Sequence, residues 1–140
     1  NVIRHAIQLQ PLSNRPPKIL LTTFPDEEHC LGILMVEAMC VAEGAHCISL
    51  GTRMPITDAA SYAAQGCFDV VAISFSGAYP ARDALKDLQH FRNLLSESIM
   101  IWAGGAGLTN KKIGMPNVQV VNHIGAVPAL VNDWRVAHAE

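Results

Sequence analysis

The feature that most restricts the fold of this chain is a rhythm that occurs five times. In each repeat, a short run rich in Val, Ile and Leu precedes a longer stretch compatible with a helix. The expected strands are residues 18–24, 46–50, 69–75, 99–103 and 118–122, and the expected helices are 28–43, 57–65, 81–95, a short one near 109–113, and 127–137. Strands that alternate with helices predict a parallel sheet covered by helices on both faces. The predicted fold class is therefore α/β: a flavodoxin-like (Rossmann-like) five-stranded sheet with strand order 2-1-3-4-5.

Length and composition fit one domain with one core. Residues 1–17 mix Gln, Asn and Arg with three prolines, so we expect a linker or leading arm there and one domain over residues 18–140. Half of the residues are apolar and only 16% are charged, which excludes a disordered chain. The net charge of −2 gives no basic surface for nucleic acid.

Neither a membrane span nor a zinc ribbon is expected. No apolar run approaches the roughly 18 residues that a membrane helix needs, so we expect a cytoplasmic protein. The four cysteines lack the close pairing of zinc ribbons, and we expect reduced, buried thiols.

In a parallel sheet of this kind, ligands bind beside the carboxyl ends of the strands. The loop after the first strand carries Asp26, Glu27 and Glu28 directly before His29. Three carboxylates would repel a phosphate, which excludes a flavin or dinucleotide cradle. Two interpretations of His29 stay open: a metal ligand whose second ring nitrogen is held by Glu27, or a bystander in the first turn of a helix whose acids favour the dipole.

Two further loops end at the same edge. Ser74 and Ser76 flank Phe75 after the third strand, where hydroxyls could meet a ligand, although Ser76 could equally cap the next helix. Gly104 and Gly105 follow the fourth strand and remove side chains, either to admit a bulky group or simply to make a tight turn.

Together these residues resemble the cobalamin-binding domains of methionine synthase, the carbon-skeleton mutases and certain gene regulators. The family pattern is Asp-x-His-x-x-Gly, Ser-x-Leu and Gly-Gly after the first, third and fourth strands. In this chain the three segments read Glu27-x-His29-x-x-Gly32, Ser74-Phe75-Ser76 and Gly104-Gly105. The resemblance covers about residues 18–134. Glu in place of Asp and Ser in place of Leu are the two departures.

The resemblance implies that cobalamin, as adenosylcobalamin or another form, binds without its own base on cobalt. His29 would be the lower cobalt ligand, and Glu27 would orient it unless Asp26 does so. Gly32 would give clearance at the helix start. Other expected contacts with the cofactor or its nucleotide tail come from Ser74, Phe75, Ser76, Gly77, Gly104 and Gly105.

In its detailed amino-acid sequence, the chain is most similar to the sensor domain of MerR-type regulators; the segments that carry this resemblance are residues 20–32, 72–80 and 102–105. This implies a transcription regulator without enzymatic turnover, in which adenosylcobalamin could sense light. DNA would be bound only through a helix-turn-helix domain, which this sequence lacks. The alternatives are a cobalamin-carrying part of a methyltransferase or mutase, a haem sensor of the same fold, and a docking role.

A scarcity of charge is concentrated in residues 31–42, where Glu37 is the one charged side chain. A helix that covers one face of a sheet needs a single apolar stripe. We therefore expect this helix to contact a second copy of the chain or a neighbouring helical cap.

Overall fold

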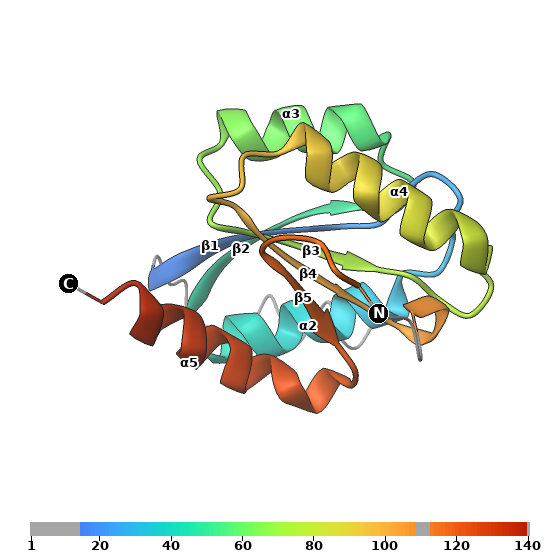
Figure 1. The fold of residues 1–140 in the computed structure, drawn as a ribbon. Helices are drawn as coiled ribbons and strands as arrows, with labels where there is room; N and C mark the ends of the chain where they lie inside the picture. The colour runs from blue at the N-terminus through green and yellow to red at the C-terminus, as the bar shows by residue number, and fades with distance from the viewer. Residues whose placement is uncertain (1–14, 109–112, 140) are drawn as a thin grey trace.

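The computed structural model describes residues 15–108 and 113–139. It contains one parallel sheet with the strand order β2-β1-β3-β4-β5, as predicted (Figure 1). The strands are β1 (Arg15–Thr22), β2 (Ala45–Gly51), β3 (Val70–Ser74), β4 (Met100–Gly104) and β5 (Val118–Val121). The helices are α2 (Leu31–Ala42), α3 (Ile56–Gln65), α4 (Ala81–Leu94) and α5 (Val127–Ala137), with short 3₁₀ turns at η1 (Ala106–Leu108) and η2 (Ile124–Ala126).

Helices cover both faces of the sheet. Figure 1 shows α3 and α4 on one side and α2 and α5 on the other. Successive strand residues face opposite sides, so in β1 Leu20 packs in the α3/α4 core whereas Ile19 and Leu21 pack in the α2/α5 core. Because both faces are buried, the central strands read as nearly continuous apolar runs.

The first repeat differs most from the predicted boundaries. Strand β1 begins at Arg15, inside the predicted arm, because Arg15 pairs with Ala45 of β2, with a shift of register between Arg15 and Lys18. The strand ends at Thr22, and α2 begins only at Leu31. The eight intervening residues, 23–30, form an irregular loop that contains the predicted histidine site. The bounds of the other strands differ from the prediction by at most one residue, and the predicted short helix near 109–113 lies largely outside the described residues.

The cysteines are free, but the expectation that all are buried is wrong. Cys40 is buried in the α2/α5 core and Cys47 is half-buried, whereas Cys30 and Cys67 are exposed. Burial and a hydrogen bond with Cys47 raise the pKa of the Cys40 thiol, the hydrogen bond being the larger cause. Cys30 directly precedes α2 and Cys67 follows α3, so both sit in connections that solvent reaches.

Helix α2 is apolar on more than its core face. Ile33, Leu34 and Cys40 are buried, while Leu31 and Met35 are exposed. Within the described part of the chain, no helix combines the length and apolar character needed to cross a membrane. The partner predicted for this helix stays a prediction.

Candidate functional site

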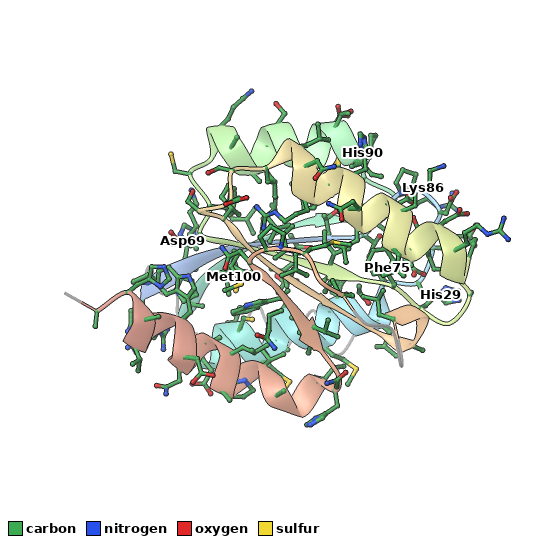
Figure 2. All side chains as sticks on the ribbon, viewed as in Figure 1. His29, Asp69, Phe75, Lys86, His90 and Met100 are labelled. Carbon is green, nitrogen blue, oxygen red and sulfur yellow. The ribbon has the colours of Figure 1, made fainter. Side chains whose placement is uncertain are left out.

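The predicted site residues come together at the carboxyl edge of the sheet. Figure 2 shows His29 and Phe75 at one end of the strands and Asp69 and Met100 at the other. The loops after β1, β3 and β4 meet there, because parallel strands all end at the same edge. Two parts can be distinguished: a network of polar residues around His29, and an apolar cavity beside it.

Glu27 is the centre of the polar network. Its side chain is 1% exposed, whereas the side chain of His29 is 64% exposed. Oε2 of Glu27 accepts a hydrogen bond from the backbone N–H of His29 at 3.1 Å and lies 3.2 Å from the ring Nδ1. A carboxylate can only accept, so the ring proton belongs on Nδ1 and Nε2 keeps its lone pair. This is the tautomer that a metal ligand binding through Nε2 requires.

Ser76 holds the other side of the same carboxylate. Its backbone N–H donates to Oε1 of Glu27 at 2.5 Å, and its hydroxyl donates to Oε2 at 2.8 Å. The hydroxyl oxygen also lies 3.3 Å from Nδ1 of His29 and accepts the N–H of Ala78 at 3.3 Å. Ser76 therefore joins the loop after β3 to the loop after β1.

The charge of Glu27 is stabilised inside the protein. Burial on its own raises the pKa of this carboxyl. The N–H and hydroxyl of Ser76, with the N–H and ring of His29, outweigh burial and lower the pKa below its ordinary value. The buried carboxylate is therefore ionised near neutral pH and can orient the imidazole. The alternative partner, Asp26, is exposed, and Glu27 is the residue bonded to His29.

The loop after β2 supports the histidine loop from the side. Thr23 accepts hydrogen bonds from the N–H of Arg53 at Oγ1, 3.1 Å, and from the N–H of Met54 at its carbonyl, 2.9 Å. The Arg53 guanidinium also pairs with the exposed carboxylate of Glu28. Surface pairs of this kind contribute little to stability, so the backbone contacts of Thr23 are the stronger link.

An apolar cavity of about 310 Å³ opens beside this network, on the α2/α5 side of the sheet. Its volume lies at the small end of the range of about 300–1,000 Å³ typical of ligand pockets. The lining residues come from α2, β3, β4 and the β5–α5 connection: Gly32, Ile33, Val36, Ala72, Ile73, Ser74, Trp102, Gly104, Gly105, Ala106, Val121, Asn122, His123, Ile124 and Val127.

The three glycines that line the cavity lie at close packing contacts, and at Gly104 and Gly105 these contacts are with backbone. A Cβ on Gly32 would lie 2.9 Å from Oγ of Ser74, so α2 approaches the end of β3 closely. At Gly104 a Cβ would meet the carbonyl of Val121 at 2.6 Å, and at Gly105, whose φ is +105°, it would meet the carbonyl of Phe75 at 2.2 Å. The absence of a side chain at Gly104 and Gly105 thus lets the backbone of Val121 and Phe75 pack against them. Both glycines also line the cavity.

The predicted residues fall into three groups. Glu27, His29 and Ser76 form the polar network, and Gly32, Ser74, Gly104 and Gly105 line the cavity. Phe75 lies in the α3/α4 core, fully buried against Phe24 and Tyr79, and Gly77 lies in the following turn near Ala106. Neither Phe75 nor Gly77 lines the cavity.

Most of the cavity wall was not identified from the sequence. Trp102 is the largest such residue, and its position two residues before Gly104 on the same strand places both on one face. The same alternation relates Ala72 to Ser74. This signal was available in the sequence, but the contributions of Val36 and Val127 depend on how α2 and α5 cross the sheet. His29 does not line the cavity. Among the described residues, no group of three or more His, Cys, Asp or Glu side chains could hold a metal ion.

The sequence matches no protein-family model and, at a significant level, no curated protein. The structure, in contrast, is similar to solved structures. A protein described as a novel cobalamin-binding protein from Desulfitobacterium hafniense superposes with a TM-score of 0.72 over 86% of this chain, at 16% identity. The methanol:cobalamin methyltransferase complex MtaBC from Methanosarcina barkeri gives 0.73 over 87% at 13% identity.

A third similar structure, the monomethylamine corrinoid protein of Methanosarcina barkeri, gives a TM-score of 0.69 over 95% of this chain at 14% identity. The chain spans 60%, 47% and 63% of the three matched chains. At these identities the similarity defines the fold: an α/β, Rossmann-like sheet that matches domains from proteins described as binding cobalamin or corrinoids.

Proposed function

We propose that this chain is a cobalamin-binding domain in which Nε2 of His29 is the lower ligand of cobalt. The observation that carries the proposal is the Glu27–His29 pair, 3.2 Å between Oε2 and Nδ1, at the sheet edge beside an apolar cavity. The buried carboxylate fixes the ring tautomer, and the exposed ring leaves Nε2 accessible to a large planar cofactor.

The residues present fit such a cofactor in both parts of the site. His29 offers one imidazole ligand to a metal that a macrocycle already holds. The cavity, beginning at Gly32 and Ser74, offers space for the nucleotide tail once the base has left the metal. When bound, the corrinoid would supply a cobalt centre that takes up and passes on a one-carbon group.

Of the roles open to such a domain, we propose that of a corrinoid carrier in a methyltransferase system. Two of the three similar structures are described as a cobalamin methyltransferase complex and a methylamine corrinoid protein, which supports this role. The chain's own residues would bind and orient the cofactor, and methyltransferase partners would add and remove the methyl group. A mutase domain would use the same cofactor site.

The MerR-type regulator is a second candidate. It is favoured by the resemblance of residues 72–80 and 102–105 to the sensor domain of MerR-type regulators. The two roles differ in their response to light: illumination of the adenosylcobalamin-loaded chain would change its elution volume on gel filtration if it is a light-dependent regulator, and would leave it unchanged if it is a carrier. A helix-turn-helix encoded next to this segment would also favour the regulator.

Cofactor binding is tested by incubating the chain with hydroxocobalamin or adenosylcobalamin, removing free cofactor by gel filtration, and recording the visible spectrum. We expect coloured protein and a spectrum that His29→Ala changes. His90→Ala is the matched control, because His90 is exposed on α4 away from the site. Colourless protein, or a spectrum that His29→Ala leaves unchanged, would refute the proposal; a Soret band with hemin and no cobalamin uptake would favour the haem alternative.

A further inference from the structure

Two of the four thiols lie together between α2 and β2. Cys40 is in the last turn of α2 and is fully buried in the α2/α5 core. Cys47 is half-buried on β2, an edge strand of the sheet, and packs against the same core. Because strand residues alternate between the two faces, Cys47 shares this face with Ala45, which also belongs to the α2/α5 core. The fold therefore places two thiols at one contact between a helix and a strand.

The hydrogen bonds of these two thiols have a defined direction. The Cys47 thiol donates its proton to the carbonyl of Ala45, with 3.8 Å between Sγ and O. Because a thiol carries one proton, the hydrogen bond between Cys40 and Cys47 uses the proton of Cys40 and a lone pair of Cys47. This bond is the largest cause of the raised pKa of the Cys40 thiol, and burial is the next. Cys40 therefore stays protonated, with its thiol directed at the sulfur of Cys47.

The other two cysteines are not placed for such a contact. Cys30 directly precedes α2, ten residues before Cys40, which corresponds to about 15 Å along a helix. Cys67 follows α3, a helix on the opposite face of the sheet (Figure 1). Both are exposed, so each reacts as a single thiol at the surface.

We propose that Cys40 and Cys47 form a redox modification site that a hydroperoxide converts to a disulfide. In the first step the sulfur of Cys47, the more accessible of the two, attacks one oxygen of hydrogen peroxide. The O–O bond breaks, and the sulfur gives up two electrons and becomes a sulfenic acid. The thiol proton of Cys47 leaves with the other oxygen as water.

In the second step the sulfur of Cys40 attacks the oxidised sulfur of Cys47. The S–O bond breaks, and the hydroxyl leaves with the thiol proton of Cys40 as a second water. One hydrogen peroxide and two thiols thus give one disulfide and two waters. The bond would join the last turn of α2 to β2, after side-chain rotation brings the sulfur atoms to about 2.05 Å.

The surroundings of Cys40 assign the first step to Cys47. The negative charges of Glu37 and Glu43 add to burial in disfavouring a thiolate at Cys40. Since the thiolate is the form that peroxide oxidises, Cys40 is protected from direct attack. Cys40 therefore reacts only after its neighbour has been oxidised.

The test uses a chain that carries Cys30→Ser and Cys67→Ser, which leaves Cys40 and Cys47 as its only thiols. After treatment with hydrogen peroxide, the thiols are titrated in denaturant with a chromogenic disulfide reagent. We expect the count to fall from two to zero in a chain that stays monomeric, and dithiothreitol to restore both thiols. Thiols that persist at peroxide concentrations that oxidise Cys30 and Cys67 of the wild-type chain would overturn the proposal. A loss that dithiothreitol does not reverse, or a disulfide between two chains, would overturn it as well.

Peptide mapping of the wild-type chain identifies the bond directly. Proteolytic cleavage after Glu37 and Glu43 separates Cys30, Cys40 and Cys47 onto three peptides. Mass spectrometry without reduction should find the peptide of Cys40 linked to that of Cys47. A peptide of Cys40 that stays unlinked, or that is linked to Cys30, would contradict the assignment.

A matched pair of variants tests the order of the steps. Cys47→Ser should leave Cys40 reduced at the same peroxide concentration, because the buried thiol then has no oxidised neighbour to attack. Cys67→Ser removes an exposed thiol away from the pair and should keep the link between Cys40 and Cys47. Equal oxidation of Cys40 in the two variants would show that Cys47 is not its partner, and the proposal would fail.

Discussion

The hydroxyl of Ser76 donates a hydrogen bond to the carboxylate of Glu27 across 2.8 Å, although 49 positions separate the two residues in the chain. Together with the bond from the Ser76 N–H, this contact ties the loop after β3 to the loop that presents His29. The orientation of the imidazole therefore depends on two strands. The ligand contact predicted for Ser76 stays a prediction, and its role within the protein is to hold Glu27.

Replacement of Glu27 by Gln should weaken both the fold and cofactor binding. The amide keeps one oxygen, so it cannot accept all the bonds that Ser76 and His29 donate. We expect the free energy of unfolding to fall by about 1–3 kcal/mol and the affinity for cobalamin to fall by about 10–100-fold. Urea denaturation and cofactor titration measure the two effects.

The matched control for this change is Glu28→Gln. Glu28 is exposed and pairs with Arg53 at the surface, so its neutralisation should change stability by less than about 1 kcal/mol. If Glu27→Gln behaves like Glu28→Gln in both measurements, Glu27 does not hold the imidazole.

Gly32→Ala should reduce cofactor affinity while leaving the fold nearly intact. The added Cβ would lie 2.9 Å from Oγ of Ser74, at the border of the cavity. The hydroxyl can rotate away, and Ala is favoured over Gly in a helix by up to about 1 kcal/mol, so unfolding should change little. The displaced hydroxyl of Ser74 then narrows the entrance of the cavity, so cobalamin titration should show weaker binding.

A double-mutant cycle tests the cause of that loss. In a Ser74→Ala background the added methyl group meets no hydroxyl, so Gly32→Ala should reduce affinity less than it does in the wild-type chain. Equal losses in the two backgrounds would mean that the narrowing does not act through Ser74.

Gly105→Ala should destabilise the protein strongly. Its φ of +105° disfavours any side chain, and a Cβ would lie 2.2 Å from the carbonyl oxygen of Phe75, which is fixed backbone. We expect a loss of more than about 2 kcal/mol, measured by urea or thermal unfolding. Gly114→Ala is the control, because a Cβ there meets nothing within 4 Å; similar losses for both would argue against the packing of Gly105 on Phe75.

Alkaline pH should destabilise the fold through Tyr79. Burial, followed by the hydrogen bond to Asp87, raises the pKa of its hydroxyl well above the value of about 10 in an unfolded chain. The native state thus favours the neutral hydroxyl. The contribution of this group to the free energy of unfolding is complete below about pH 10 and is lost as the pH rises further. The free energy of unfolding should fall by up to about 1.4 kcal/mol per pH unit from this group.

Tyr79→Phe removes this titration, so stability between pH 10 and 11 should fall less steeply in that variant. Tyr62→Phe serves as the control, since it removes the hydroxyl of an exposed tyrosine. An unchanged slope in Tyr79→Phe would show that Tyr79 does not produce the alkaline loss.

The sequence predicted the strands well because their signal is local. Runs such as residues 70–73 are apolar at every position, as burial on both faces requires, and this pattern does not depend on distant residues. The start of β1 was misplaced for the opposite reason. Arg15 and Pro16 carry no strand signal of their own, and Arg15 belongs to the sheet because it pairs with Ala45, 30 residues away.

The site likewise has features that the sequence predicts and features that depend on tertiary packing. The spacing of Glu27, His29 and Gly32, and the strand ends at Ser74 and Gly104, could be read from the sequence because topology brings all parallel strand ends to one edge. Glu27 as the partner of His29, rather than Asp26, follows from burial, which only the packed loops determine.

The sequence by itself determined the order and type of the elements and the edge at which chemistry could occur, since hydrophobic periodicity and the handedness of crossovers are properties of the chain. Only the tertiary structure decided that Ser76 turns to Glu27, that Phe75 faces the opposite core, and that Trp102 and Val127 enclose a cavity. These features depend on the distances at which helices and loops pack across the sheet, and close packing is set by all the neighbouring side chains together.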